Sequence, residues 1–474
     1  MCAPPTIPET AATDAARNLR IAYTFTLAAG AARGVWSYAV LSGYLYVLTG
    51  GSNARVGLAE GAQGIAQCAC GLLAGWAADR FRRQTVCRVA CVTGVVASLG
   101  LILAIAVSDV SARARFDYVT VGLAAFGAYQ GVWSTALETL FADSTAPGAH
   151  RAAATARKFG FTLLATTAGP ALALILFLCI GDDWSLAALR TVAVVGLALC
   201  APPALLLLGL RDVGADACDD EDEDEAGDEG IARLILVADL ISGFGSGMTV
   251  KFIPLFFKNR AAFSPVAANA LSIGAALVMI CGSRVCEKWS QSAGKARVCA
   301  ACMVLAAIAL LGLAWADAGR LNVLRPGRPA LTSTIKRAGA VVLYLITCAQ
   351  HACRPLKKAA LNDHVPHNAR GRWNALDGVT RFGWSGSAVL GGYLVDRGGY
   401  ALTFVVTAAT QLIAALVWLA LIGRVDPHAA GLVPRRRAPT EDSLEEPLME
   451  EAAPTTRATS GSFVVDDYSE MPRG

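Results

Sequence analysis

The apolar and polar positions of this chain alternate on a long scale, with apolar stretches of about 20 residues separated by short polar segments. A helix needs roughly that length to cross the ~30 Å hydrocarbon core of a bilayer. We therefore expect an all-α, polytopic membrane protein with twelve transmembrane helices. The predicted crossings cover residues 21–48, 57–78, 86–107, 118–140, 160–180, 187–210, 231–257, 266–287, 298–316, 339–361, 373–395 and 401–423.

Polar segments divide these crossings into two sets of six. Between the sets, every residue from Asp219 to Glu225 is acidic, and such a block repels itself and is typical of a disordered linker. The sequence that follows the last crossing is polar and contains prolines, which is typical of a disordered tail. The predicted organisation is a cytoplasmic N-terminal segment (1–17), an N-terminal six-helix bundle (18–211), an acidic cytoplasmic linker (212–230), a C-terminal six-helix bundle (231–424) and a cytoplasmic tail (425–474).

Composition and charge also indicate a membrane protein. Of the 474 residues, 55% are hydrophobic and 16% are charged, and the mean hydropathy of +0.48 is far from that of a soluble domain. Lysine and arginine are enriched in the loops that an internal N-terminus places in the cytoplasm, which favours two cytoplasmic termini. A basic cluster in a predicted outer loop opposes this topology: Arg320, Arg325, Arg328, Lys336 and Arg337. Nothing in the sequence indicates which membrane holds the protein.

Nearly all of the 14 cysteines lie inside apolar stretches. Cys299 and Cys302 form a CxxC pair, but no other cysteine or histidine stands near them at metal-ligand spacing. We interpret the pair as packing residues and expect neither a metal site nor a cofactor. The partners that we expect are membrane lipid and a small-molecule substrate, with a proton or another coupling ion as an option. We expect no nucleic-acid partner, and the oligomeric state is not indicated.

The two halves of the chain resemble each other. The stretch YQGVWSTALETLFADS, which begins at Tyr129, aligns with AQHACRPLKKAALNDH, which begins at Ala349. A second pair of similar segments, which begin at Lys158 and Arg381, follows in the same order. Duplicated halves are common in transporters, where the interface between the halves holds the substrate near the membrane midplane.

A polar motif, GWAADRFRRQ, separates the second and third predicted crossings. Gly75 and Asp79 are four residues apart and share one helix face, while Arg80 and Arg83 follow at the membrane surface. The motif resembles the signature of the major facilitator superfamily at this place: glycine, three residues, aspartate, a basic residue, one residue, glycine, arginine and a basic residue. Gly75, Asp79, Arg80 and Arg83 match this signature.

The resemblance covers about residues 18–424 and implies the fold of that superfamily, with two pseudo-symmetric six-helix bundles. It implies secondary active transport by alternating access, in which the bundles rock about a central site. In the family the aspartate pairs across the halves and braces the outward-facing state. The four matching residues are therefore predicted to form a conformational latch.

The sequence departs from the family pattern at several positions. Arg82 replaces the second glycine of the motif, and Gln84 replaces its last basic residue. Gly127 stands where family members often carry an arginine that is tied to proton coupling, which weakens the case for proton symport. The fifth crossing lacks most of the glycine pattern of antiporters, so the direction of exchange is not predicted.

Ionisable residues inside crossings are candidate functional residues, because a charge in the bilayer costs a few kcal/mol unless it meets water or a partner. Arg33 and Arg354 lie too deep in their crossings to reach bulk water easily. The candidates for substrate binding are Arg33, Gln130, Lys251, Gln350 and Arg354. The candidates for ion pairing or proton coupling are Glu138, Asp239 and Lys358. The repeat aligns Glu138 with Lys358, which favours an ion pair across the interface at least as strongly as a proton site.

Basic groups predominate in this set, and a buried guanidinium binds carboxylate or phosphate through paired hydrogen bonds. We therefore expect an organic or inorganic anion as the substrate. A neutral polar solute such as a sugar, bound by glutamine and aromatic side chains, is the alternative. The chain has no phosphate-binding loop of a primary pump and no catalytic constellation, so we expect no enzyme. A non-transporting sensor or scaffold with the same fold is the remaining alternative.

Overall fold

The computed structural model describes residues 9–107, 109–145, 149–213, 228–318, 334–365, 383–384 and 386–425. These residues form helices and turns, and no β-strand occurs among them. The all-α prediction is confirmed. Most of the predicted linker, the tail beyond residue 425, the basic residues 320–328 and residues 366–382 lie outside the described part of the chain.

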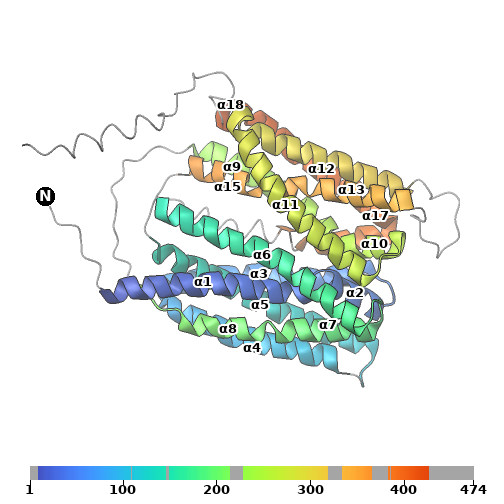
Figure 1. Cartoon of the computed structure of the whole chain (residues 1–474), viewed down its shortest axis with the longest axis horizontal. Coiled ribbons are helices and arrows are strands. Elements are labelled where there is room, and N and C mark those ends of the chain that lie inside the picture. Colours follow the sequence, from blue (N-terminus) through green and yellow to red (C-terminus); the bar gives the residue numbers. More distant parts are fainter. Residues whose placement is uncertain are drawn as a thin grey trace, which may run out of the picture.

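Two groups of helices, which we call the N-half and the C-half, lie side by side in Figure 1. The N-half contains α1 (Glu9–Trp36), α2 (Ala39–Leu48), α3 (Asn53–Arg80), α4 (Arg83–Ala106), α5 (Ala112–Asp143), α6 (Ala149–Ile180), α7 (Leu186–Ala198), α8 (Ala201–Leu206) and the short 3₁₀ helix η1 (Leu207–Gly209). The C-half contains α9 (Glu229–Val250), α10 (Ile253–Ala261), α11 (Pro265–Ala293), α12 (Lys295–Ala318), α13 (Thr334–Thr347), α14 (Ala349–Ala352), α15 (Arg354–His364), α17 (Ala388–Ala420) and α18 (Ile422–Val425).

Several predicted crossings are built from more than one helix. The first consists of α1 and α2, and the tenth of α13, α14 and α15. The end of the eleventh crossing and most of the twelfth form the single element α17, which is interrupted at Gly399, where φ is 73°. This backbone conformation is open to glycine because glycine has no Cβ. The chain therefore reverses direction there with almost no loop.

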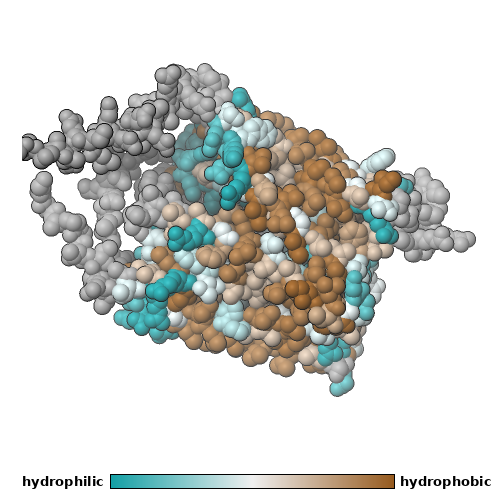
Figure 2. Space-filling view, in the orientation of Figure 1, coloured by the Kyte–Doolittle hydropathy of each residue, from teal (hydrophilic) through white to brown (hydrophobic). Residues whose placement is uncertain are grey.

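The surface of the molecule carries an apolar belt. Figure 2 shows hydrophobic residues across the middle of this face and hydrophilic residues gathered towards its two ends. Seven helical segments of the described residues are by themselves long and apolar enough to cross a membrane. This distribution is the one expected for a protein whose sides contact lipid and whose ends contact water. The chain is therefore a multi-pass integral membrane protein.

We call the end of the molecule with the turns at 49–52, 181–185, 262–264 and 399 the outer end, because the predicted topology directs it away from the cytoplasm. The opposite end, with the turns at 81–82, 210–213 and 294, is the inner end. The two halves meet mainly along α3 with α17 and along α6 with α11.

Glycines bring helices into close contact both within and between the halves. A Cβ added at Gly127 or Gly131 of α5 would collide with backbone carbonyl oxygens of α3. Between the halves, a Cβ at Gly57 of α3 would collide with the backbone of α17, and one at Gly392 of α17 would collide with the backbone of α3. Small residues at such crossings are the usual means by which helices associate in a membrane.

The close contact of α3 and α5 predicts a specific sensitivity. We expect Gly131→Val to lower the free energy of unfolding by about 1–3 kcal/mol, because the added side chain overpacks the contact with Gln67. Thermal unfolding in detergent measures the effect as a lower Tm. Gly100→Val in α4 is the control, because Gly100 has open space around it. Equal losses of stability in the two variants would contradict the role of this contact.

Candidate functional site

A cavity of about 380 Å³ lies between the two halves. The N-half contributes Tyr38 and one face of α6, and the C-half contributes α9, α10, α11 and the broken tenth crossing. Much of the wall is apolar or aromatic. The polar groups on it include Ser246, Thr249, Ser272, Gln350, His351 and Arg354. Among the described lining residues there is one arginine and no aspartate or glutamate.

The breaks in the tenth crossing place the polar groups on this wall. The turns at Cys348 and Cys353 separate α13, α14 and α15. Pro355 has no N–H and therefore cannot continue the helical hydrogen-bond ladder. Arg354 begins α15 and is exposed to the cavity. Gln350 is buried and accepts a hydrogen bond of 2.9 Å from the Ser246 hydroxyl of α9.

Trp384 adds an aromatic wall and a hydrogen-bond donor. It lines the cavity from the segment before α17. Its indole N–H is buried and has no hydrogen-bond partner among the described residues. A buried donor without a partner is unusual in a folded protein.

Arg33 lies in a second polar cluster, inside the N-half, and does not line the cavity. The side-chain amide of Gln130 is oriented with its oxygen towards Arg33 and its nitrogen towards Gln63. In this orientation the oxygen accepts hydrogen bonds of 3.0 and 3.1 Å from the Nε and Nη1 atoms of Arg33. The amides of Gln130 and Gln63 are also in contact, at 2.9 Å. The cluster therefore connects α1, α5 and α3, and it contains two of the five predicted substrate-binding residues.

Lys251, another predicted substrate-binding residue, forms an ion pair with a residue that sequence reasoning missed. Its Nζ atom donates a hydrogen bond of 2.6 Å to Oε2 of Glu60. The side chains are 9% and 1% exposed, so this ion pair is almost fully buried. It joins α3 of the N-half to the end of α9 in the C-half. Glu60 is an acid inside a predicted crossing, and the same criterion that selected Lys251 would have identified it.

The candidates for ion pairing lie within single halves. Asp239 of α9 contacts Lys357 of α15 at 2.9 Å. Glu138 of α5 contacts Lys158 of α6 at 2.8 Å. Lys358, the residue that the repeat aligns with Glu138, is exposed on α15. The structure thus pairs Glu138 inside its own half and not with Lys358.

The residues of the predicted latch lie at the inner end. Asp79 is exposed and forms no ion pair with a described residue. Arg80 lies over the ring of Trp76, 4.6 Å from its centroid, and Arg83 forms an ion pair with Asp143 of the same half. Gly75 lies against Thr135 of α5. The latch role stays a prediction, because none of these contacts crosses between the halves.

Contacts at the outer end, by contrast, join the two halves. Asp396 of α17 accepts hydrogen bonds from the backbone N–H groups of Asn53 and Ala54, at 2.9 and 2.8 Å, and thereby caps α3. Asp182 accepts a hydrogen bond of 2.8 Å from the N–H of Val266, and Trp184 donates one of 2.8 Å to the carbonyl of Phe263. At the inner end, ion pairs between described residues stay within one half: Asp14–Arg211, Arg83–Asp143, Glu138–Lys158 and Lys295–Asp363. The described polar contacts between the halves are therefore concentrated at the outer end.

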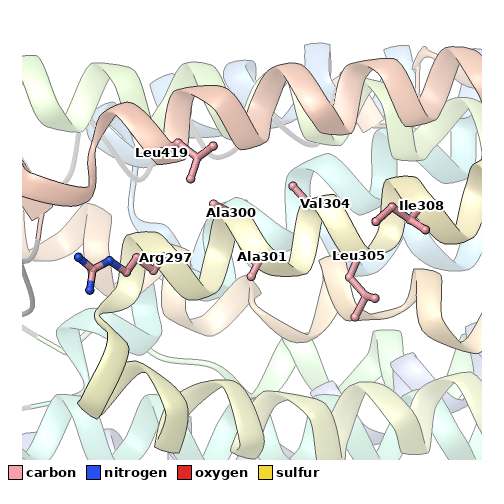
Figure 3. Close-up of a pocket in the computed structure, with 7 residues that line it drawn as sticks. All are labelled: Arg297, Ala300, Ala301, Val304, Leu305, Ile308 and Leu419. Atoms are coloured by element: carbon pink, nitrogen blue, oxygen red, sulfur yellow. The ribbon is translucent and has the colours of Figure 1, made fainter.

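A shallow apolar groove occurs elsewhere, on the outside of the C-half. Figure 3 shows it between α12 and α17, with Arg297 at one end and small or aliphatic side chains along its length. Two of them, Leu305 and Ile308, are 48% and 61% exposed. These residues belong to the apolar belt, so lipid contact accounts for the groove.

Comparison with solved structures identifies the architecture. A crystal structure of the D-xylose–proton symporter matches with a TM-score of 0.66 at 15% identity, over 88% of this chain and 99% of that chain. A bacterial homologue of the iron transporter ferroportin in its inward-facing state matches with a TM-score of 0.64 at 14% identity, over 86% and 99%. The human organic anion transporter MFSD10 matches with a TM-score of 0.57 at 16% identity, over 85% and 99%. These likenesses show the fold.

Similarity at the level of sequence indicates the same architecture. No curated protein matches this sequence. The family description Major Facilitator Superfamily matches residues 23–355, which is more than half of the 474 residues. The fold predicted from the motif around Asp79 is thus confirmed. The chain belongs to the Major Facilitator Superfamily of membrane transporters.

Proposed function

We propose that the protein is an alternating-access carrier for a small organic anion, which binds in the cavity between the halves. The family supports transmembrane transport, and the cavity supplies a place for a solute. The observation that carries the anion assignment is Arg354. It is exposed to the cavity, and the described lining contains no carboxylate that would neutralise it.

The physical argument concerns charge inside the bilayer. A guanidinium that faces a cavity at membrane depth is stabilised by water or by a bound anion. A carboxylate, sulfonate or phosphate accepts two hydrogen bonds from it, and the Gln350 amide is a further polar group at the wall. The apolar wall and the volume of about 380 Å³ favour an organic anion with an apolar body over a bare inorganic ion.

The neutral polar solute remains the second candidate. Ser246, Thr249 and Gln350 resemble the hydroxyl and amide groups that bind sugars, and similar folds belong to a xylose symporter and a nucleoside transporter. A non-transporting sensor is the candidate from another class. Neither candidate needs Arg354, so the substitution of this residue distinguishes them from the anion carrier.

The conformation supports alternating access. The contacts that close the outer end join turns and helix ends of opposite halves, whereas ion pairs at the inner end stay within one half. We infer that the structure represents the state with its cavity shut from the outside. Together with two cytoplasmic termini, as the loop charges predict, this is an inward-facing state.

Substitution of Arg354 tests the anion assignment. Thermal shift of the purified protein against benzenesulfonate, succinate, phosphate and xylose first selects a ligand, because a ligand of the folded state raises Tm. We expect Arg354→Gln to weaken anion binding about tenfold or more, since a hydrogen bond to a charged group contributes about 1.5–3 kcal/mol. Lys358→Gln, four residues further along α15 and outside the cavity wall, is the control.

Liposome uptake of the same ligand then separates the functions. An anion carrier takes up the anion in a manner that depends on Arg354. Uptake that is equal in wild type and Arg354→Gln, or a preference for xylose, would exclude the anion assignment. Binding without uptake would favour the sensor.

Closure of the outer end gives a second prediction. We expect Asp396→Asn to increase hydrogen–deuterium exchange in residues 49–57, because α3 loses the carboxylate that caps it from the other half. Exchange in residues 262–268 should rise as well if the whole outer end loosens. The control is Asp183→Asn at the same end, because the hydrogen bond described for Asp183 is made with Ser185 of its own turn. There the Ser185 side chain and N–H lower its pKa. An unchanged exchange rate in Asp396→Asn would refute the closure.

A further inference from the structure

The ion pair between Glu60 and Lys251 is the one buried pair of opposite charges that joins the two halves in the described part of the chain. Glu60 lies two turns into α3 from the outer end, and Lys251 follows the last residue of α9. Thr249 and Val250, the two residues before Lys251, line the cavity, and so do Ile253 and Pro254 after it. The pair is therefore set between the cavity and the contacts that close the outer end.

Among the described groups around Glu60, Lys251 is the one that carries a positive charge. From α2, the Ser42 hydroxyl donates a hydrogen bond of 3.5 Å to Oε1 of Glu60. Gly57 and Gly61 of α3 lie close to Glu60 and contact α17. The α17 groups that they contact are backbone atoms and the apolar side chain of Val389. From α5, Gln130 reaches Gln63, one turn further inward.

Lys251 has one more neighbour. Its ammonium lies 5.7 Å from the ring centroid of Trp384, a cavity residue, so it is within cation–π distance. Its side chain is thus held between the carboxylate of the N-half and an aromatic ring of the cavity wall.

Opening of the outer end must separate this pair, because its two members belong to different halves. Removing one partner of a buried ion pair is strongly destabilising, since the remaining charge is left unpaired. Water that enters the opened end stabilises the separated charges in part, and the outer end opens more readily when both charges are neutralised in another way. An anion neutralises Lys251, and a proton neutralises Glu60.

We infer that Glu60 is a tethered counter-anion that occupies Lys251 while the outer end is closed, and that an external anion takes its place at Lys251 as Glu60 takes up a proton. This inference rests on the proposed function and extends it to the coupling ion. Lys251 becomes the anion site of the outward-facing state, and Arg354 that of the inward-facing state. On closure, Glu60 returns its proton and displaces the anion from Lys251 towards the cavity.

The charges balance in each state. The closed state holds one carboxylate and one ammonium, and the open state holds one protonated carboxyl, one ammonium and one bound anion. Both have the same net charge, so an anion that carries one negative charge enters with one proton, and no net charge crosses the membrane. The carrier is then driven by a pH gradient and is insensitive to the membrane potential.

The first test needs no substrate. Hydrogen–deuterium exchange in proteoliposomes is measured for residues 49–60 and 253–268, with exchange times scaled for the intrinsic effect of pH. We expect Glu60→Gln, which imitates the protonated acid and leaves Lys251 unpaired, to raise exchange at the outer end about tenfold or more. The double variant Glu60→Gln/Lys251→Met should restore protection, because neither charge remains.

Glu229→Gln is the matched control, since Glu229 pairs with Arg233 four residues away on the surface of α9. Glu60→Gln with the exchange of wild type, or a double variant that is as open as Glu60→Gln, would overturn the inference. Circular dichroism and Tm of each variant exclude general unfolding as the cause of faster exchange.

The second test measures coupling. Benzenesulfonate stays ionised at neutral and mildly acidic pH, so it carries no proton through the lipid by itself. When this anion is added outside liposomes that contain a pH dye, the pH of the liposome interior should fall. Lys251→Met should abolish this fall in internal pH. Benzenesulfonate uptake without acidification, or uptake driven by the membrane potential, would overturn the coupling while the carrier function stands. Absence of any anion uptake would count against the proposed function, and the exchange measurements would still decide the role of Glu60.

Discussion

A charge inside the hydrocarbon layer must have a partner or water, and this constraint organises the whole structure. The backbone satisfies the corresponding constraint for its polar groups by forming helices throughout the described residues. Among the ionised side chains, Asp239 meets Lys357 and Glu60 meets Lys251. Arg354 is different, because none of the described residues that line the cavity is a carboxylate that would neutralise it, which leaves this role to a solute or water. The charge pattern thereby separates groups that hold the fold from groups that face a ligand.

The same constraint distinguishes the two ends of the molecule. Ion pairs inside one half move with that half and make it a rigid unit, whereas contacts between the halves have to break when the halves rotate. The described polar contacts between halves lie at the outer end and at the Glu60–Lys251 pair. Opening of the outer end must break these hydrogen bonds and this ion pair, so they contribute to the free energy that separates the two states of the carrier. A solute that replaces one of these partners changes the balance between the states.

Much of the fold was accessible from the sequence, because crossing a bilayer demands length and apolarity that can be read residue by residue. The motif from Gly75 to Arg83 then indicated the family. The site was less accessible, since the sequence shows that a residue is ionisable but does not show its partner. Arg33 and Arg354 looked alike as deep arginines, yet one binds Gln130 inside a half and the other faces the cavity. Glu60 could have been selected as an ionisable residue inside a crossing, but its pairing with Lys251, 191 positions further along the chain, could not have been read from the sequence.

The glycine contact between α3 and α17 bears on the speed of the carrier. At Gly57 and Gly392 the two helices touch backbone to backbone, so at these points no side chain projects from one half into a recess of the other. Surfaces that interdigitate must first pull apart before they turn, and that separation adds to the activation barrier. The Val389 side chain, which packs against Gly61, is an exception, but the backbone contacts at Gly57 and Gly392 limit interdigitation, so the halves can rotate here while they stay in contact. The rate of switching would then be governed by the polar contacts at the ends, and bulk added along this contact would slow turnover without changing what the cavity recognises.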